Sequence, residues 1–300
     1  MIRTSLAALT LVAFGATAGV AASNEVNLYS YRQPFLINPM LDAFTKETGI
    51  KVNVVYAKNG ILEKLKAEGA NSPADVILTV DVARLNDIAA AGLLQPVKSA
   101  TLEKNIPAHY REPNGLWFGL TTRARVIFVS KARVKEGQIK SYEDLTDPKW
   151  KGRICMRSGK HPYNISLIAS VIAHKGEKGT ETWLKGLSAN LARKPQGNDR
   201  AQAKAILEGV CDAALANTYY MGAMATNDKQ PEQKTWADAV RIVFPNQGDR
   251  GTHVNISGAA VTKSAKNRDN AIKLLEFLSG DTAQKLYAAK NFEYPVKAGV

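Results

Sequence analysis

ADVILTV, at residues 74–80, is the stretch that decides the fold class of this chain. It is short and almost continuously apolar, which is typical of a parallel strand that is buried on both faces. Residues 81–94, which follow directly, have helical periodicity, and Asp81 stands where its side chain can cap the helix. A buried strand leading straight into a helix predicts one unit of an α/β sheet.

The same alternation extends upstream. Strands are predicted at 25–31 and 50–57, and helices at 38–49 and 60–70. Gly49 is expected to end the first of these helices. Strand and helix alternating three times are the pattern of an α/β sheet with right-handed crossovers.

A second α/β pattern follows downstream. Its predicted strands lie at 125–131, 153–158, 211–217, 240–248 and 251–263, and its predicted helices at 164–176, 180–192, 200–209, 268–280 and 281–290. The chain of 300 residues also exceeds the usual size of a single core. We therefore predict two α/β lobes with a binding cleft between them.

The chain is expected to cross between the lobes near Thr121–Arg123 and again near Phe244–Gly248. The N-terminal lobe is predicted to comprise 23–121 and 247–292, and the C-terminal lobe 122–246, with 293–300 at its edge. The chain stops at NFEYPVKAGV, in a loop-like segment directly after a helix, so we expect a further C-terminal segment.

The N-terminus has the pattern of a secretory signal. Arg3 precedes an apolar run from Leu6 to Val20, and small residues follow at 21–23. The alternative is an uncleaved anchor helix. We predict a signal peptide at 1–22 and, with it, export to the periplasm.

Net charge and cysteine content do not by themselves identify a function. The formal net charge is +13, but Lys and Arg are scattered through helices and form no basic stripe with interleaved aromatic residues, so nucleic-acid binding is not expected. Cys155 and Cys211 lie in short apolar stretches. In an oxidising compartment they are expected either to form one bridge or to remain two buried thiols.

Enzyme motifs are not found in the sequence. It contains no GxSxG, HExxH or Gly-rich phosphate loop, and its four histidines are dispersed. We expect a binding protein, not an enzyme.

Three tyrosines are the candidate site. Tyr219 and Tyr220 follow the strand at 211–217, where Asn217 or Thr218 can cap a helix. In a first helical turn the two phenols can converge, and Tyr163 likewise lies after a strand, at a helix entry. Three phenols would suit a hard cation such as Fe³⁺. The alternative is a set of amphipathic rim residues with packed rings and wet hydroxyls.

The segments LYSYRQP, LWFGLTTRARVIFVSK, PQGNDRAQ, ANTYYMG and FPNQGDRGTHVNISG, with others in order along the mature chain, resemble the periplasmic ferric-iron-binding proteins of bacterial ABC importers. The resemblance implies the class II periplasmic binding protein fold, a two-lobed clamshell that closes on Fe³⁺. It places the family's motif tyrosines on Tyr163, Tyr219 and Tyr220.

The residues after the first strand differ from those of many family members and indicate which subgroup the chain resembles. Many relatives carry a His-Tyr pair after the first strand, where this chain has Gln33 and Pro34. The chain is therefore similar to the subgroup in which three tyrosines bind iron with carbonate or bicarbonate as a synergistic anion. Fe³⁺ with three tyrosinates is neutral and carbonate makes the cluster net negative, so cationic donors are required. We expect Arg123, Gln33 and Arg32 to contact the anion.

The resemblance also implies partners. The iron would come from chelates or host iron proteins and pass to an inner-membrane ABC permease with its ATPase, and the protein is expected to be a monomer. The alternative function is binding of an anionic solute such as phosphate or sulfate on the same fold.

Overall fold

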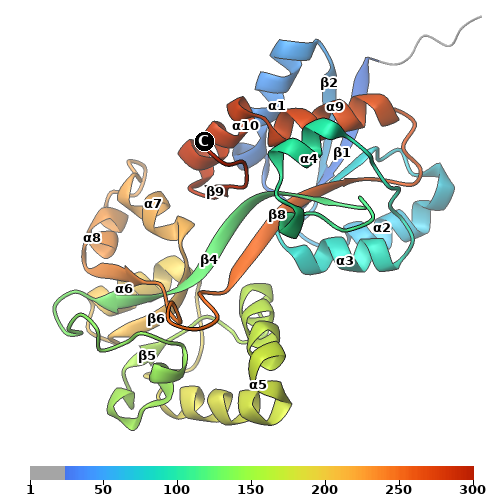
Figure 1. Ribbon diagram of the computed structural model, residues 1–300. Helices are drawn as coiled ribbons and strands as arrows, with labels where there is room; N and C mark the ends of the chain where they lie inside the picture. The colour runs from blue at the N-terminus through green and yellow to red at the C-terminus, as the bar shows by residue number, and fades with distance from the viewer. Residues whose placement is uncertain (1–23) are drawn as a thin grey trace, which may run out of the picture.

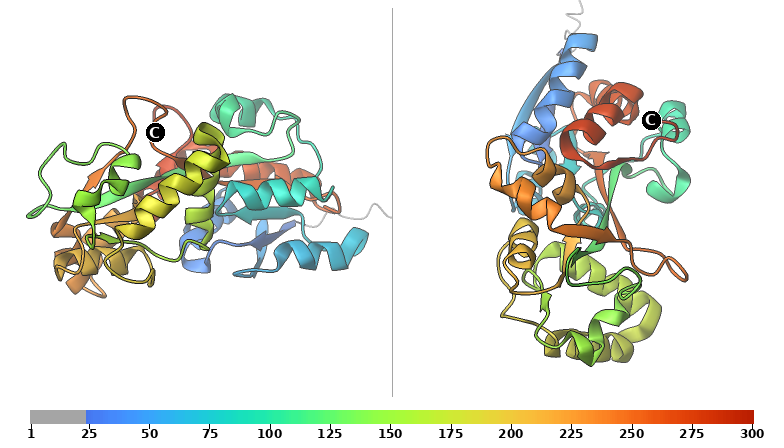
Figure 2. Two further views of the ribbon diagram at one scale, coloured as in Figure 1. Left: turned by 90° about the horizontal axis from the view of Figure 1, so that it is seen from below. Right: turned by 90° about the vertical axis from the view of Figure 1, so that its left-hand side faces the viewer.

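The structure, a computed structural model, describes residues 24–300 of the chain, so the predicted signal segment at 1–22 lies outside the described residues. Figures 1 and 2 show two lobes, each of strands flanked by helices. Two long strands, β4 (Phe118–Ser130) and β8 (Val254–Val261), run from one lobe towards the other. The predicted two-lobed α/β architecture is confirmed.

The strand within ADVILTV lies inside the first lobe. It is β3 (Val76–Thr79), and all four of its residues are buried. It pairs in parallel with β1 (Glu25–Ser30), which in turn pairs in parallel with β2 (Lys51–Tyr56). On its other side β3 pairs antiparallel with β8. Burial on both faces is therefore as predicted, but the sheet is mixed because β8 returns from the second lobe.

Strand β4 belongs to both lobes, and all of its residues are buried. Up to Ala124 it pairs with β8, and from Arg125 onward it pairs with β6 (Ala213–Asn217). The sequence prediction began this strand only at Arg125. The residues before it include Thr121, Thr122 and Arg123. These polar residues are buried in the structure, but their sequence lacks the apolar pattern from which a buried strand is predicted.

The strand order across the whole sheet is β2-β1-β3-β8-β4-β6-β5, with β7 (Val240–Val243) and β9 (Tyr294–Pro295) also paired to β4. Strand β5 (Ile154–Cys155) runs parallel to β6. Because parallel strands end at one edge of a sheet, the segments that follow β5 and β6 emerge together.

Helices of the first lobe match the predictions except at their ends and at one place. Helix α1 begins at Pro34, earlier than predicted, and Gly49 ends it in the left-handed conformation. Helix α4 was not predicted. The helices of this lobe are α1 (Pro34–Thr48), α2 (Ile61–Glu68), α3 (Val82–Ala90), α4 (Ala100–Asn105), α9 (Arg268–Ser279) and α10 (Asp281–Leu286).

Helices of the second lobe differ more. The two helices predicted at 164–176 and 180–192 are confirmed as two helical stretches, which share the label α5 (Pro162–Ala189) and are separated by a kink at Gly176. Gly176 has φ 67° and ψ 174°, which is not a helical conformation, so the first stretch is interrupted there. The other helices of this lobe are α6 (Asp199–Leu207), α7 (Tyr219–Ala225) and α8 (Glu232–Asp238), the last of which was not predicted.

Each lobe has hydrophobic clusters on both faces of its sheet. In β1, Val26 and Leu28 pack with α1 and α9, whereas Tyr29 packs with α2 and α3 on the opposite face. This alternation is the two-residue period of a strand. At the end of the chain Val296 packs in the cluster of α1 and α9. Helices thus cover the faces of the sheet, and the strand ends between the lobes are left to form a site.

Candidate metal centre

The second lobe places the first tyrosine at a helix entry. After β5 the chain turns into α5, where Pro162 occupies the first helical position and His161 is the N-cap. The Nδ1 atom of His161 accepts a hydrogen bond from the backbone N–H of Tyr163 at 3.3 Å. This cap fixes the first turn of α5, and the side chain of Tyr163 therefore projects from a defined position beside the sheet edge.

The paired tyrosines stand at the next strand end. Strand β6 ends at Asn217, and α7 begins at Tyr219. The rings of Tyr219 and Tyr220 lie 4.4 Å apart between centroids. The hydroxyl of Tyr219 donates a hydrogen bond to the hydroxyl of Tyr163 at 3.0 Å. The three phenols expected from the sequence are therefore brought together by two strand ends of one lobe.

The helix cap expected beside the paired tyrosines is not formed. Thr218 occupies the N-cap position of α7, but its side chain makes no capping hydrogen bond. Its hydroxyl instead accepts from the backbone N–H of Ala124 at 3.3 Å. Asn217 donates to the hydroxyl of Tyr219 at 3.4 Å. Both side chains therefore tie the tyrosine turn to neighbouring groups instead of capping the helix.

Burial makes the phenols of Tyr219 and Tyr220 hard to ionise in the metal-free protein. It raises the pKa of Tyr219 well above its ordinary value, and the neighbouring Tyr163 and Tyr220 raise it further. The pKa of Tyr220 is also raised, first by burial and then by Asp199. A phenol with a raised pKa stays protonated at neutral pH, so a bound cation would have to displace its proton.

Two arginines that sequence reasoning missed lie against the phenol rings. The guanidinium of Arg157 lies 5.2 Å from the ring centroid of Tyr163, and that of Arg200 lies 5.0 Å from the ring centroid of Tyr220. Both distances are within the range of cation–π contacts. These cations would also favour the phenolate forms once the protons leave.

Arg125, on β4, is a buried structural residue. It donates to Asp199 at 2.6 Å, and its side chain and that of Asp199 are 2% and 0% exposed. Further hydrogen bonds go to Asn164, at 2.8 Å, and to Asn217, at 3.0 Å. The ion pair between Arg125 and Asp199 is therefore buried inside the second lobe. Its role is to join β4, β6, α5 and α6 below the phenols.

Arg123, two residues earlier, is buried to the same extent but differently partnered. Its Nη1 donates to the hydroxyl of Ser257 at 2.9 Å. Among residues 24–300, no carboxylate forms an ion pair with it. Arg32 donates to the same hydroxyl at 2.7 Å but is paired with Glu293 at 2.8 Å. Of the two guanidiniums, only that of Arg32 has its charge balanced.

Gln33, the third residue expected to contact an anion, is exposed. It occupies the N-cap position of α1, where its side chain makes no capping hydrogen bond. Its amide is therefore not engaged as a cap.

A small cavity lies at the base of Tyr163. It is lined by Arg123, Arg125, Tyr163, Asn217, His253 and Asn255. His253 and Asn255 were not identified from the sequence. Only the strand register, which pairs Asn255 with Arg123, brings them to this place.

Asp81 of the first lobe lies close to this site. Asp81 caps α3, as predicted, by accepting from the N–H of Ala83 at 2.9 Å. It also accepts from the hydroxyl of Ser166, one turn beyond Tyr163 on α5, at 3.2 Å.

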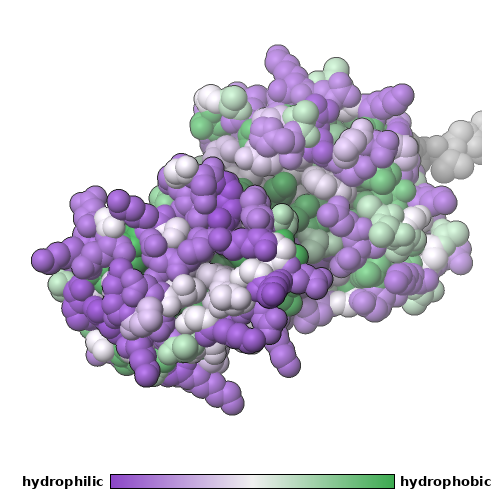
Figure 3. All heavy atoms as spheres, turned by 60° about the horizontal axis from the view of Figure 1, so that its bottom comes forward, coloured by the Kyte–Doolittle hydropathy of each residue, from purple (hydrophilic) through white to green (hydrophobic). Residues whose placement is uncertain are grey.

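Figure 3 shows a hollow between the lobes on the face that it presents. Within residues 24–300, no three His, Cys, Asp or Glu side chains gather as metal ligands.

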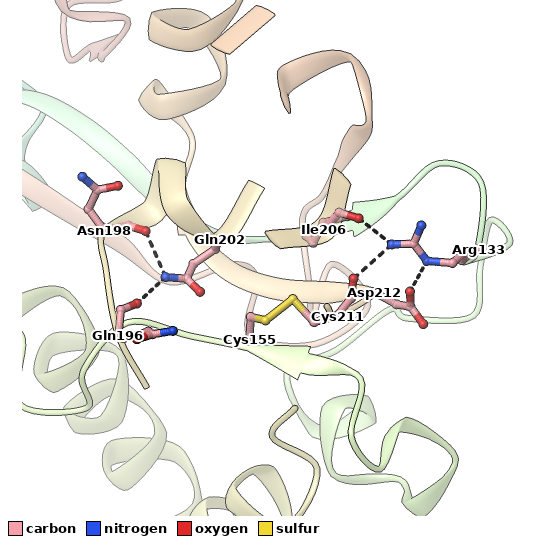
Figure 4. Close-up of a disulfide and its surroundings, with 8 residues drawn as sticks. All are labelled: Arg133, Cys155, Gln196, Asn198, Gln202, Ile206, Cys211 and Asp212. Atoms are coloured by element: carbon pink, nitrogen blue, oxygen red, sulfur yellow. Dashed lines mark hydrogen bonds and ion pairs between the residues drawn. A yellow bond between two sulfur atoms is a disulfide. The ribbon is translucent and has the colours of Figure 1, made fainter. Parts of the chain in front are cut away.

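A disulfide joins β5 to the residues just before β6, the two strands that precede the tyrosine-bearing helices α5 and α7. Cys155 and Cys211 are bridged, with their Cα atoms 5.8 Å apart, so of the two outcomes left open by the sequence the bridge is the one observed (Figure 4). Each cysteine lies about eight residues before a tyrosine, Tyr163 or Tyr219. The bridge therefore restrains the two tyrosine-bearing segments relative to each other.

Known proteins are similar to this chain over most of its length. A family model described as bacterial extracellular solute-binding protein matches residues 71–300. Iron uptake protein A1 of Synechocystis sp. is 52% identical over 277 residues, which are 92% of this chain and 77% of that protein. The structure of apo ferric ion-binding protein A of Pasteurella haemolytica has a TM-score of 0.87 and 55% identity, covering 92% of this chain and 86% of that one.

A Trichodesmium protein solved in complex with iron and citrate ligands is also similar. It has a TM-score of 0.87 and 49% identity, and the match covers 92% of this chain and 87% of that one. The names of these relatives describe iron uptake or ferric-ion binding, and none describes catalysis. In residues 24–300 of this chain, no helix is long and apolar enough to span a membrane.

Proposed function

The chain belongs to the family of bacterial extracellular solute-binding proteins, and from this membership we propose that it captures Fe³⁺ in the periplasm and delivers it to an ABC permease and its ATPase in the inner membrane. The observation that carries the proposal is the convergence of Tyr163, Tyr219 and Tyr220, with 3.0 Å between two of their hydroxyls. Membership of a family of binding proteins also agrees with the prediction that the chain is not an enzyme.

The three phenols are the proposed iron ligands. Phenolate oxygen is a hard donor that suits a hard trivalent cation. Three phenolates neutralise Fe³⁺, and the cations of Arg157 and Arg200 at the rings would offset negative charge that a bound anion adds. Capture would thus exchange up to three protons for one cation.

Carbonate or bicarbonate is the proposed synergistic anion. Its binding is supported by Arg123, a guanidinium that is 2% exposed and has no carboxylate partner among the described residues. A buried cation without a counter-charge is costly, and a small anion would remove that cost. Arg32 is already balanced by Glu293, so we assign it to holding Ser257 in place. Exposed Gln33 would donate its amide from the first lobe.

Release follows from the same chemistry. Acidification returns protons to the phenols and to the anion together, so iron should dissociate as pH falls. Because burial raises the pKa of Tyr219, protons compete with iron at this position across the whole neutral range. Reduction to Fe²⁺ lowers the cation's charge and should also weaken binding.

The test is ferric-iron affinity measured in competition with a chelator, with bicarbonate present. Tyr163→Phe, Tyr219→Phe and Tyr220→Phe should each lower affinity more than about a hundredfold, which exceeds the usual loss from removing a residue that only supports a metal ligand. Tyr56→Phe, an exposed tyrosine on β2, is the matched control and should bind as the unaltered protein does. Wild-type affinity in all three site variants would refute the proposed ligands.

Two further experiments test other anions. In the first, the affinity for iron is measured with citrate in place of bicarbonate, because a similar structure contains iron with citrate ligands. Calorimetry with phosphate and sulfate in the absence of iron tests the alternative that the chain binds a simple anionic solute through Arg123. Tight phosphate or sulfate binding without any affinity for iron would favour that alternative.

A further inference from the structure

The β4–β8 pair presents four polar residues on one face beneath Tyr163. Arg123 is paired with Asn255 across the two strands. The backbone N–H of Arg125 donates to the carbonyl of His253 at 2.9 Å, so these two residues also lie opposite each other. Side chains alternate between faces along a strand and match across it. All four side chains therefore point to the same side, and all four line the cavity at the base of Tyr163.

Two of these four side chains are hydrogen-bonded to carboxylates and other protein groups. Arg125 is held by Asp199 and by two asparagines. Asn255 donates to Asp81 at 2.8 Å, and its carbonyl oxygen accepts from the backbone N–H of Val82. The hydrogen-bond donors of Arg125 and the carbonyl oxygen of Asn255 are therefore already bonded to protein groups.

The other two side chains have fewer protein partners. Arg123 is buried and has no carboxylate partner among residues 24–300. The Nε2 atom of His253 is buried and has no hydrogen-bond partner in that part of the chain. Buried polar atoms are almost always hydrogen-bonded, and an exception such as Nε2 of His253 needs a physical reason. This atom and the guanidinium of Arg123, which lacks a counter-charge, belong to side chains that line the same cavity.

The imidazole of His253 is uncharged at neutral pH. Burial, together with Arg123 and Arg125, lowers the pKa of His253 to about 4. A neutral imidazole carries one N–H, which Nε2 can present as a donor. This side chain can therefore add a hydrogen bond to the cavity without adding a charge.

We propose that His253 is an anion-binding residue, donating from Nε2 to the same small oxyanion that the guanidinium of Arg123 attracts. The proposal rests on the proposed function, in which carbonate or bicarbonate accompanies Fe³⁺. Arg123 and His253 are diagonal neighbours across the strand pair, a relation in which residues lie roughly 7–8 Å apart. Two hydrogen bonds of about 2.8 Å to one small oxyanion can bridge side chains at that separation. The anion would then lie beside Tyr163, where the metal is expected.

The test is calorimetric titration of the iron-free protein with sodium bicarbonate. His253→Phe keeps an aromatic ring but removes the donor, and should weaken bicarbonate binding about tenfold, the usual effect of losing one hydrogen bond to a charged group. His253→Gln restores an N–H donor and should recover most of the affinity. His174→Phe, at an exposed histidine on α5, is the matched control and should have no effect.

Thermal unfolding of each iron-free variant identifies any variant that is not folded, and His253→Gln keeps the proposal testable if His253→Phe fails to fold. Equal bicarbonate affinity in the wild type and in folded His253→Phe would overturn the proposal, as would a wild type that binds no bicarbonate. The proposed function is tested separately, by the colour that iron gives at saturating bicarbonate. A wild type that colours while His253→Phe has unchanged anion affinity refutes only the role of His253.

Discussion

Arg123 and Arg125 lie two residues apart on β4, on the same face, and each is 2% exposed. Arg125 is surrounded by protein acceptors, with Asp199 as its counter-charge. Arg123 has the hydroxyl of Ser257 and no carboxylate among the described residues. The two residues also differ in strand pairing. Arg123 pairs with a residue of β8, whereas Arg125 pairs with a residue of β6.

The difference separates two uses of one residue type. The protein itself satisfies Arg125, so this residue contributes to the folded state of the second lobe. Arg123 is a buried cation without a carboxylate partner among the described residues, and for this reason we propose that it binds an anion. Residue type, burial and strand face are identical for the two residues, so only the partners distinguish a structural arginine from a ligand-binding one.

The largest expected effect is on folding. Arg125→Met should lower the free energy of unfolding by about 3–5 kcal/mol, because it leaves Asp199 buried without its main partner. Arg123→Met leaves no carboxylate behind and should change it by less than about 1 kcal/mol. Urea unfolding of the iron-free variants measures both, and equal losses would remove the distinction between the two arginines.

The Arg125 side of the strand is also secured by the disulfide. Replacing Cys155 and Cys211 together by Ala should lower the free energy of unfolding by about 2–4 kcal/mol, since the bridge closes a loop with a sequence separation of 56. The same variant should bind iron more weakly well below its unfolding temperature, because the tyrosine-bearing segments lose a restraint. Unchanged iron affinity would mean that the bridge acts on folding alone.

On the Arg123 side the expected effect is on ligand binding. Arg123→Gln should weaken iron capture at limiting bicarbonate about 10- to 100-fold, the range expected for a lost charge-assisted hydrogen bond. The loss should shrink when bicarbonate is raised. Chelator competition at several bicarbonate concentrations measures this effect, and a loss that is independent of bicarbonate would contradict the assignment.

The smallest expected effect is at the first lobe. Gln33→Ala removes one neutral donor from an exposed position and should weaken bicarbonate-dependent iron capture only about two- to tenfold. The same competition assay measures it. A loss larger than that of Arg123→Gln would move the anion site towards α1.

Local sequence patterns predicted a large part of this arrangement. Strand ends followed by helix starts placed Tyr163 with Tyr219 and Tyr220, and Asp81 was recognised as a helix cap. The resemblance to ferric-iron-binding proteins is confirmed by relatives whose names describe that activity. These features depend on neighbours in the sequence or on a pattern that spans the whole chain.

The remaining features depend on contacts between distant segments. His253 reaches the cavity only because β8 pairs with β4 in one register, and a shift of one residue would turn it to the other face. The partners of Arg125 come from α5, α6 and β6. Thr218 bonds to β4 instead of capping α7. The boundaries of the lobes stay a prediction.

The most direct measurement is the visible absorption spectrum of the protein loaded with Fe³⁺ and bicarbonate, recorded over a range of pH. Phenolates bound to Fe³⁺ should give a charge-transfer band at neutral pH that is lost on acidification, because protons return to phenols whose pKa burial has raised. The band should be absent in Tyr219→Phe. Tightly bound iron with no such band, or a band unaffected by this substitution, would contradict the account.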